Sequence, residues 1–199
     1  MLASITPLGE RGRGNRWWLT TAAYELGSAA GGAAMGAAAG GIGEVVRLAV
    51  LPSAPGRAGL ALAVTLVALA VDLGRPGRLP TWNRQVDKAW LDRYRGWVYG
   101  AGFGVQLGTG LVTIVNSAAM YALVGLILLL GSPLLGAIAG TVFGVARAAP
   151  LLAFGRARDF AAMQATHRRL DRLAASSRLG TLAVLSMAAL VLAVSASLR

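Results

Sequence analysis

Long apolar runs separated by short polar segments dominate this sequence. About 20 consecutive apolar residues in a helix cross the hydrocarbon core of a bilayer. On this criterion we predict five main membrane spans, at residues 17–51, 57–73, 96–130, 134–154 and 179–198. Helix breakers separate them, as in Pro52 to Gly56 and Gly131 to Pro133. The pattern therefore predicts an all-α, polytopic transmembrane bundle.

Two of these spans, 17–51 and 96–130, are longer than one crossing needs. At 1.5 Å per residue such a helix would extend about 50 Å, against a hydrocarbon core of roughly 30 Å. Each could protrude or tilt, be broken within the membrane, or form a pair of short helices. We favour broken or re-entrant helices, because glycines crowd the first span, although a break needs protein or water around it. A hidden crossing would bring the count from five spans to six.

The two long spans also resemble each other. Residues 25–28 read ELGS and residues 106–109 read QLGT, and each long span is followed by a proline-containing turn and a shorter span. We expect a two-repeat core, because repeated membrane domains commonly place their site at the repeat interface. The predicted single membrane domain, 1–199, then comprises repeat one (about 16–73), an amphipathic loop (74–95), repeat two (about 95–154), a second amphipathic loop (155–178) and the last span (179–198).

The basic residues predict how the chain is oriented. With the N-terminus inside, the cytoplasmic segments hold most of the arginines, whereas the outer segments hold Arg57 and Arg199. This asymmetry is what the positive-inside rule describes. We therefore expect a multi-pass protein of the bacterial cytoplasmic (inner) membrane with a cytoplasmic N-terminus.

Composition narrows the function further. The chain is 56% hydrophobic and 14% charged, whereas soluble domains average about 45–50% and 25%. Its net charge of +11 is explained by membrane topology, so we expect no nucleic-acid partner. The absence of cysteine excludes disulfides, thiol redox chemistry and iron–sulfur clusters. With His167 as the single histidine, we expect no cofactor and no metal site.

Polar residues inside the long spans are the candidates for a binding site. A carboxylate within the membrane is costly and is a functional candidate by default, and Glu25 occupies such a position. Gln106 is its counterpart in the second repeat and could face it across a central cavity. The predicted substrate-binding residues are Glu25, Ser28, Gln106, Thr109, Thr113, Asn116 and Arg147.

Each of these residues also has a structural interpretation. Hydroxyl and amide side chains such as those of Thr109, Thr113 and Asn116, which share one helical face, routinely hydrogen-bond between transmembrane helices. Arg147 either extends toward the basic loop or serves as a counter-charge for an anion or for Glu25. Rows of glycine at every fourth position predict close helix packing rather than binding.

The two basic loops have the pattern of amphipathic helices. One runs from Thr81, and the other begins after Asp159, a predicted N-cap, with arginines beside its apolar positions. We expect these arginines to bind the anionic headgroups of membrane lipids at the cytoplasmic face. Docking of a protein partner there is the alternative.

A run of glycine and phenylalanine from Tyr99 to Gly108 resembles a known pattern. It is similar to the broken helix in the membrane domain of the cytochrome c biogenesis and disulfide electron carriers (CcdA/DsbD type, within the LysE-like exporter superfamily), and Gly140 to Gly144 resembles that family's next span. The family has a Pro-Cys pair after the run, but this chain has neither residue in 109–117. The resemblance therefore implies a broken-helix core of the kind used by small-solute exporters, without electron transfer.

Together these features predict a small transporter or channel-like protein that moves an ion or a small polar solute through a site at the repeat interface. The alternative is a non-catalytic membrane subunit that anchors or assembles a larger complex. We expect no enzymatic activity, because no nucleophile–base or metal constellation is visible. A homo-oligomer or a partner membrane subunit is compatible with both interpretations.

Overall fold

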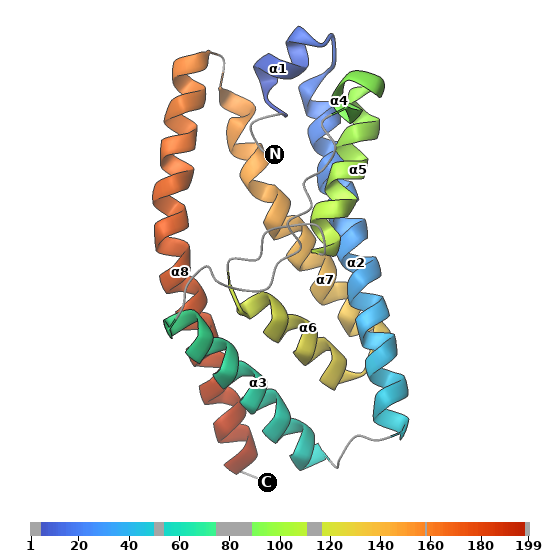
Figure 1. Ribbon diagram of the computed structural model, residues 1–199, viewed down its shortest axis with the longest axis vertical. Coiled ribbons are helices and arrows are strands. Elements are labelled where there is room, and N and C mark those ends of the chain that lie inside the picture. Colours follow the sequence, from blue (N-terminus) through green and yellow to red (C-terminus); the bar gives the residue numbers. More distant parts are fainter. Residues whose placement is uncertain (1–4, 50–53, 75–88, 111–116, 158, 198–199) are drawn as a thin grey trace. The chain divides into compact units, whose positions relative to one another are not determined.

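The computed structural model describes residues 5–49, 54–74, 89–110, 117–157 and 159–197, and all regular structure within them is helical (Figure 1). In chain order the elements are α1 (Pro7–Gly12), α2 (Trp17–Ala49), α3 (Ala54–Gly74), α4 (Trp90–Arg93), α5 (Gly96–Thr109), α6 (Ala119–Leu130), α7 (Pro133–Ala148), the 3-10 helix η1 (Ala149–Arg156) and α8 (Phe160–Ser197). The predicted all-α class is confirmed for the described residues.

The first long span is one continuous helix. Helix α2 runs unbroken for 33 residues, so the expected break in this span was wrong and the overlong alternative applies. A glycine in a helix interior costs about 1 kcal/mol relative to alanine, which is why its glycines suggested a break. Several of them instead lie where another backbone approaches closely, so packing stabilises the helix at the positions that looked weak.

The second long span contains two helices, which excludes a single overlong helix and fits both a broken helix and a pair of short helices. Helix α5 ends at Gly110, whose φ of 71° is the left-handed conformation that commonly terminates helices. Helix α6 begins after Ala118 and ends at Gly131, which is also left-handed with φ 56°. The two long spans therefore differ in their helical structure, and the predicted duplication stays a prediction.

The C-terminal part of the chain departs from the predicted division into a loop helix and a separate span. One helix, α8, covers 38 residues from Phe160 to Ser197. Its start was predicted correctly, because the carboxylate of Asp159 accepts the N–H of Ala162 at 2.7 Å, as an N-cap does. No proline interrupts the change from amphipathic to apolar sequence, so the helix continues through it.

Three helical segments are long and apolar enough to cross a membrane, among the residues that the structure describes. They are Gly56–Gly74, Pro133–Gly155 and Phe160–Val194. The described parts of the other two predicted spans, 17–51 and 96–130, do not meet this criterion of length and apolar composition. Helix α2 is rich in glycine and contains Glu25, Glu44 and Arg47, which lower its hydropathy, while α5 and α6 are each shorter than one crossing.

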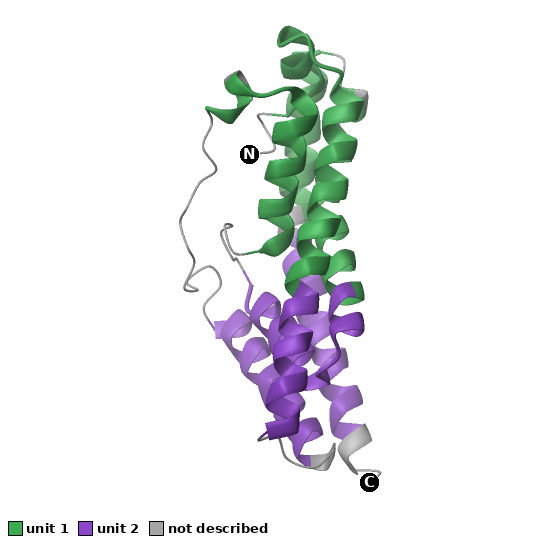
Figure 2. Cartoon of the chain, turned by 90° about the vertical axis from the view of Figure 1, so that its right-hand side faces the viewer, with its two compact units in different colours: residues 1–35, 82–113, 138–173 green, residues 36–81, 114–137, 174–199 purple. Residues whose placement is uncertain are grey.

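The chain forms two compact units (Figure 2). Unit 1 comprises residues 1–35, 82–113 and 138–173, and unit 2 comprises residues 36–81, 114–137 and 174–199. The buried core of unit 1 is formed by Ile5, Tyr24, Tyr99, Phe103, Ala148 and Leu151. The buried core of unit 2 is formed by the smaller set Ala68, Ala118, Ala122 and Leu185.

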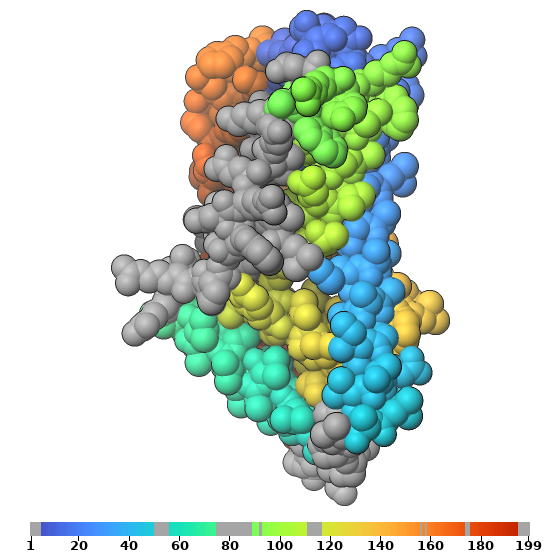
Figure 3. Space-filling model, turned by 45° about the vertical axis from the view of Figure 1, so that its right-hand side comes forward, coloured from blue at the N-terminus to red at the C-terminus, as the bar shows by residue number. Residues whose placement is uncertain are grey.

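Each unit is a helix cluster in its own right. In unit 1 the first half of α2 packs against α5 and against the second half of α7, through the glycines described below. In unit 2 α6 lies between α3 and the C-terminal half of α2 (Figure 3). A methyl group on Gly43 of α2 would overlap the backbone of Leu128 on α6, so these two helices touch through their backbones.

Candidate functional site

Unit 1 contains all the predicted site residues that the structure describes. Glu25 and Ser28 lie on α2, Gln106 and Thr109 on α5, and Arg147 on α7. The other two predicted residues, Thr113 and Asn116, lie outside the described residues. The three helices that carry the predicted site therefore belong to the same compact cluster.

Glycine contacts fix which faces of α2 and α5 meet. Methyl groups on Gly104 and Gly108 of α5 would overlap the backbone carbonyls of Tyr24 and Ser28 on α2. Gln106 lies midway between these two glycines, about 200° around the helix from each. Its side chain therefore leaves α5 on the side away from α2. We expected Gln106 to face Glu25, but these contacts turn Gln106 away from the helix that carries Glu25.

The glycines of α7 fix the other face of α2 in the same way. A methyl group on Gly144 would overlap the carbonyl of Ser28, and one on Gly32 would overlap the carbonyl of Gly140. Glu25 is close in helical angle to Ser28 and Gly32, at three and seven residues' separation. Glu25 is therefore on the side of α2 that faces α7, one turn before the closest approach of the two helices.

Glu25 has an incomplete set of hydrogen bonds. Its Oε1 atom is buried and has no hydrogen-bond partner among the described residues, although the side chain as a whole is half-buried. A buried carboxylate oxygen without a donor is costly, and such groups in native proteins commonly bind an ion or a proton. Glu25 is therefore the described predicted residue whose chemistry is least explained by packing.

Ser28 has a structural partner. The residue is fully buried, and its Oγ donates to the backbone carbonyl of Gly144 at 2.8 Å. This hydrogen bond joins α2 to α7 at the point where Gly144 lets the two backbones approach. For Ser28 the geometry matches the alternative interpretation, in which hydroxyl groups hold transmembrane helices together.

Thr109 and Arg147 also have local contacts. The Thr109 hydroxyl donates to the carbonyl of Gln106 in its own helix at 3.0 Å. The guanidinium of Arg147 lies 5.5 Å from the ring centroid of Phe143, one turn earlier on α7.

A buried network around Glu10 was not anticipated from the sequence. Glu10 is fully buried, and the Tyr99 hydroxyl donates to its Oε1. Arg13 donates to the same oxygen at 2.8 Å, and Thr20 donates to Oε2 at 2.9 Å. Burial is the largest single influence on the pKa of Arg13 and lowers it, but the hydrogen bonds and charge interactions with Glu10 and Tyr99 together outweigh burial, so the pKa of Arg13 lies above its ordinary value.

Asn15 extends this network between the N-terminal segment and α5. Its side-chain amide donates to the Tyr99 hydroxyl at 3.3 Å, and its Oδ1 accepts the backbone N–H of Gly96 at 3.3 Å. The sequence does indicate the short helix α1 that carries Glu10, because Thr6 followed by Pro7 is the pattern of a helix start. The Thr6 hydroxyl accepts the N–H of Gly9 at 3.1 Å.

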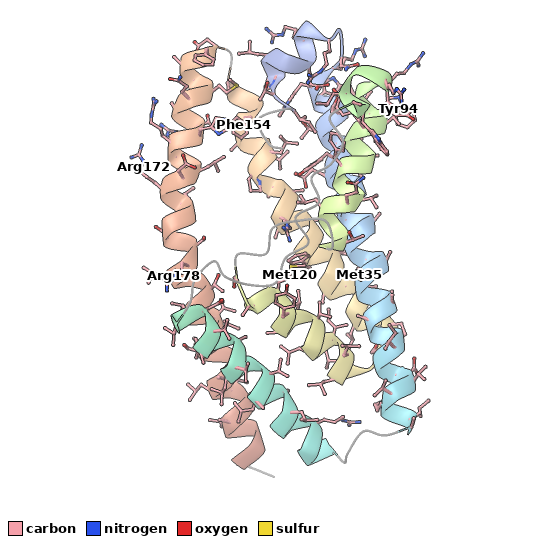
Figure 4. The ribbon with its side chains drawn as sticks, in the orientation of Figure 1. Met35, Tyr94, Met120, Phe154, Arg172 and Arg178 are labelled. Carbon is pink, nitrogen blue, oxygen red and sulfur yellow. The ribbon has the colours of Figure 1, made fainter. Side chains whose placement is uncertain are left out.

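Unit 2 contains a second buried carboxylate, that of Asp72 near the end of α3. The two oxygens of Asp72 accept from the Ser117 hydroxyl at 2.6 Å and from the N–H of Ala118 at 2.7 Å. Arg178, labelled in Figure 4, donates to the Asp72 backbone carbonyl at 3.2 Å. Asp72 therefore holds the start of α6, and α8 caps the end of α3.

His167 takes part in an aromatic contact. Its ring centroid lies 4.8 Å from that of Phe154, a buried residue of η1 labelled in Figure 4. The contact fixes the first half of α8 against η1 within unit 1.

The chain matches no protein-family model, no curated protein and no solved structure. The resemblance to the disulfide electron carriers therefore stays a prediction.

Proposed function

We propose that this chain is a multi-pass protein of the bacterial cytoplasmic membrane that moves a cation or a small polar solute, with Glu25 as its binding group. The three apolar segments that are long enough to cross a membrane support this location. Helix α2 supplies a further crossing in the proposal, since its 33 residues exceed the roughly 20 that a span needs. The arginine asymmetry of the sequence favours a cytoplasmic N-terminus.

The buried, unpartnered oxygen of Glu25 is the observation that carries the proposal. Within a membrane a carboxylate is expensive unless a proton, a cation or a donor compensates it. The neighbouring hydroxyl of Ser28 is already bound to Gly144, so it does not supply that donor. A substrate cation or proton would complete the coordination of Glu25.

The end of α5 favours a positively charged substrate. The C-terminal end of a helix has a partial negative charge, and broken membrane helices use such ends to bind cations. Gly108, in the last turn of α5, packs on Ser28 of α2. Ser28 is three residues from Glu25, which corresponds to about 4.5 Å along the helix. The carboxylate and the negative helix end thus lie about one helical turn apart along α2.

Flux through the purified protein tests this proposal. The protein would be reconstituted alone in liposomes, and uptake of H⁺, Na⁺, K⁺ and guanidinium would be measured separately. We expect flux of one of these cations, reduced at least about tenfold by Glu25→Gln, which corresponds to roughly 1.4 kcal/mol of lost interaction. The matched control is Glu44→Gln, which removes a second carboxylate from the same helix and should leave flux within about twofold.

Two results would contradict the proposal. One is flux that responds equally to Glu25→Gln and Glu44→Gln. The other is no flux for any of the cations from protein that elutes as a single species. In that case a stoichiometric partner recovered in mild detergent would favour the alternative function, a subunit that assembles a larger complex.

A further inference from the structure

An open apolar groove lies in unit 2 between α3, α6 and α8. It encloses about 800 Å³, within the range of roughly 300–1,000 Å³ that is usual for small-molecule sites. All of its walls are apolar side chains except at one position, Arg57. Representative wall residues are Ala61 of α3, Leu126 and Leu130 of α6, and Val184 and Met187 of α8.

The walls of this groove are exposed to the surroundings of the protein. The side chains of Val184 and Met187 are 68% and 65% exposed, and that of Leu130 is 56% exposed. Exposed apolar surface of this kind marks a site for an apolar partner or a membrane. Helices α3 and α8 both contain segments that are long and apolar enough to cross a bilayer. Acyl chains are therefore the apolar material that would surround the groove under the proposed membrane location.

Arg57 gives the groove a charged end. It is the fourth residue of α3, at the beginning of the apolar segment Gly56–Gly74. The first turn of a helix has backbone N–H groups without partners in the helix, and its partial positive charge attracts anions. Arginine itself matches the geometry of a phosphate group. The polar end of an occupant is thus expected to be a phosphate at the level of the lipid headgroups.

We propose that this groove binds a membrane phospholipid, with an acyl chain along α3, α6 and α8 and the headgroup phosphate on Arg57. The proposal depends on the membrane location given above but not on transport through Glu25. The bound lipid would fill the space between the three helices and join α8 to the packed pair of α3 and α6.

A second copy of this chain fits the groove less well than a lipid. An apolar helix from another copy could cover the walls, but it would need an anion for Arg57. Within the described parts of α3 and α6 and residues 179–197 of α8, the acidic residue is Asp72. Both oxygens of its carboxylate are bound, to Ser117 and to Ala118. A phospholipid supplies the apolar chain and the anion in one molecule.

Native mass spectrometry of the full-length protein tests the proposal. The protein would be stripped of lipid in mild detergent and titrated with dioleoylphosphatidylglycerol or with dioleoylglycerol, which has the same chains without the phosphate. We expect one bound phosphatidylglycerol per chain at low concentration and at least about tenfold weaker binding of dioleoylglycerol. Arg57→Ala should remove this difference between the two lipids, whereas Arg47→Ala, on α2 in the same unit, should preserve it.

A second pair of variants tests the position of the acyl chain. Val184→Trp places a large side chain in the groove, and Leu190→Trp places the same side chain elsewhere on α8; both native residues are exposed, so neither change disturbs the core. We expect Val184→Trp to weaken binding of both lipids by about tenfold or more, and Leu190→Trp to leave it unchanged.

Three results would overturn the proposal: phosphatidylglycerol binding that is unaffected by Arg57→Ala, equal effects of the two tryptophan variants, or a lipid-free dimer whose dissociation follows Val184→Trp. These outcomes are separate from a failure of the proposed function. Loss of the membrane location would appear as protein in the soluble fraction, and a failure of transport would appear in the flux assay alone.

Discussion

Replacing Glu10 by alanine should destabilise unit 1 strongly. The carboxylate accepts hydrogen bonds from Tyr99, Thr20 and Arg13. Removing it leaves the hydroxyl protons of Tyr99 and Thr20 without their acceptor, and both side chains are almost completely buried. Each buried donor that loses its partner costs about 1–3 kcal/mol. Arg13 remains partly exposed to solvent, so the loss of its hydrogen bond to Glu10 adds little to the cost.

The expected loss of stability is therefore about 2–6 kcal/mol. The lower part of this range applies if Thr20 turns to the carbonyl of Arg16, which already lies 3.5 Å from its hydroxyl. For a chain of this length 1 kcal/mol corresponds to about 2–4 °C in Tm, so Tm should fall by roughly 4–24 °C. Glu10→Gln keeps one acceptor oxygen and should lower Tm by about half as much.

Thermal unfolding of the purified protein in mild detergent, followed by tryptophan fluorescence, measures these shifts. Arg11→Ala is the control, with an expected change of about 2 °C or less, because this side chain is exposed and lies outside the network. A decrease below about 2 °C for Glu10→Ala, or a larger decrease for Arg11→Ala than for Glu10→Ala, would refute the assignment of Glu10 as the centre of the network.

Because the chain has no cysteine, Ser132→Cys should react with an impermeant thiol reagent in intact cells, whereas Ala89→Cys should react only after permeabilisation; the reverse would overturn the predicted orientation. Gly108→Ala should lower stability by about 1–3 kcal/mol, because its methyl group meets the backbone of α2. The control is Gly180→Ala, whose methyl group meets nothing within 4 Å and should raise stability by about 0.5–1 kcal/mol. Equal effects of the two substitutions on stability would contradict the close packing of Gly108 on α2. Asp72→Ala should cost about 1–3 kcal/mol in the same melting assay, and an unchanged Tm would show that Asp72 does not hold the start of α6.

The helical class and many helix ends could be predicted from local sequence, because breakers and caps act within a few residues. The helix after Asp159 begins where its N-cap was expected, and the turn at Gly131 separates α6 from α7. The continuity of α2 could not be predicted in this way. A glycine in an isolated helix is a weak point, but a glycine at a helix crossing allows another backbone to pack there. Whether a glycine of α2 weakens the helix or allows packing depends on its contacts with residues such as Gly104 and Gly144. These residues lie about 80 to 120 positions along the chain from the part of α2 that they contact.

The same limit explains what was missed at the candidate site. Ser28 looked like a binding residue because its partner, the carbonyl of Gly144, is 116 positions away. Glu10 looked like an ordinary charge in a polar N-terminal segment because its partner Tyr99 is 89 positions away. Glu25 could be identified locally, since a carboxylate within an apolar run is unusual whatever its partners are.

Chemical modification of Glu25 tests the central claim, that its carboxylate binds the transported cation, most directly. Purified protein in liposomes would be treated with a hydrophobic carbodiimide, which modifies carboxylic acids in apolar surroundings, and the extent of modification at Glu25 and Glu44 would be measured by peptide mass spectrometry. If Glu25 binds the transported cation, its modification is slowed several-fold by one of Na⁺, K⁺ or guanidinium or by raising the pH, with no cation effect at Glu44. A Glu25 that stays unmodified, or whose modification is the same under all of these conditions, would contradict this claim.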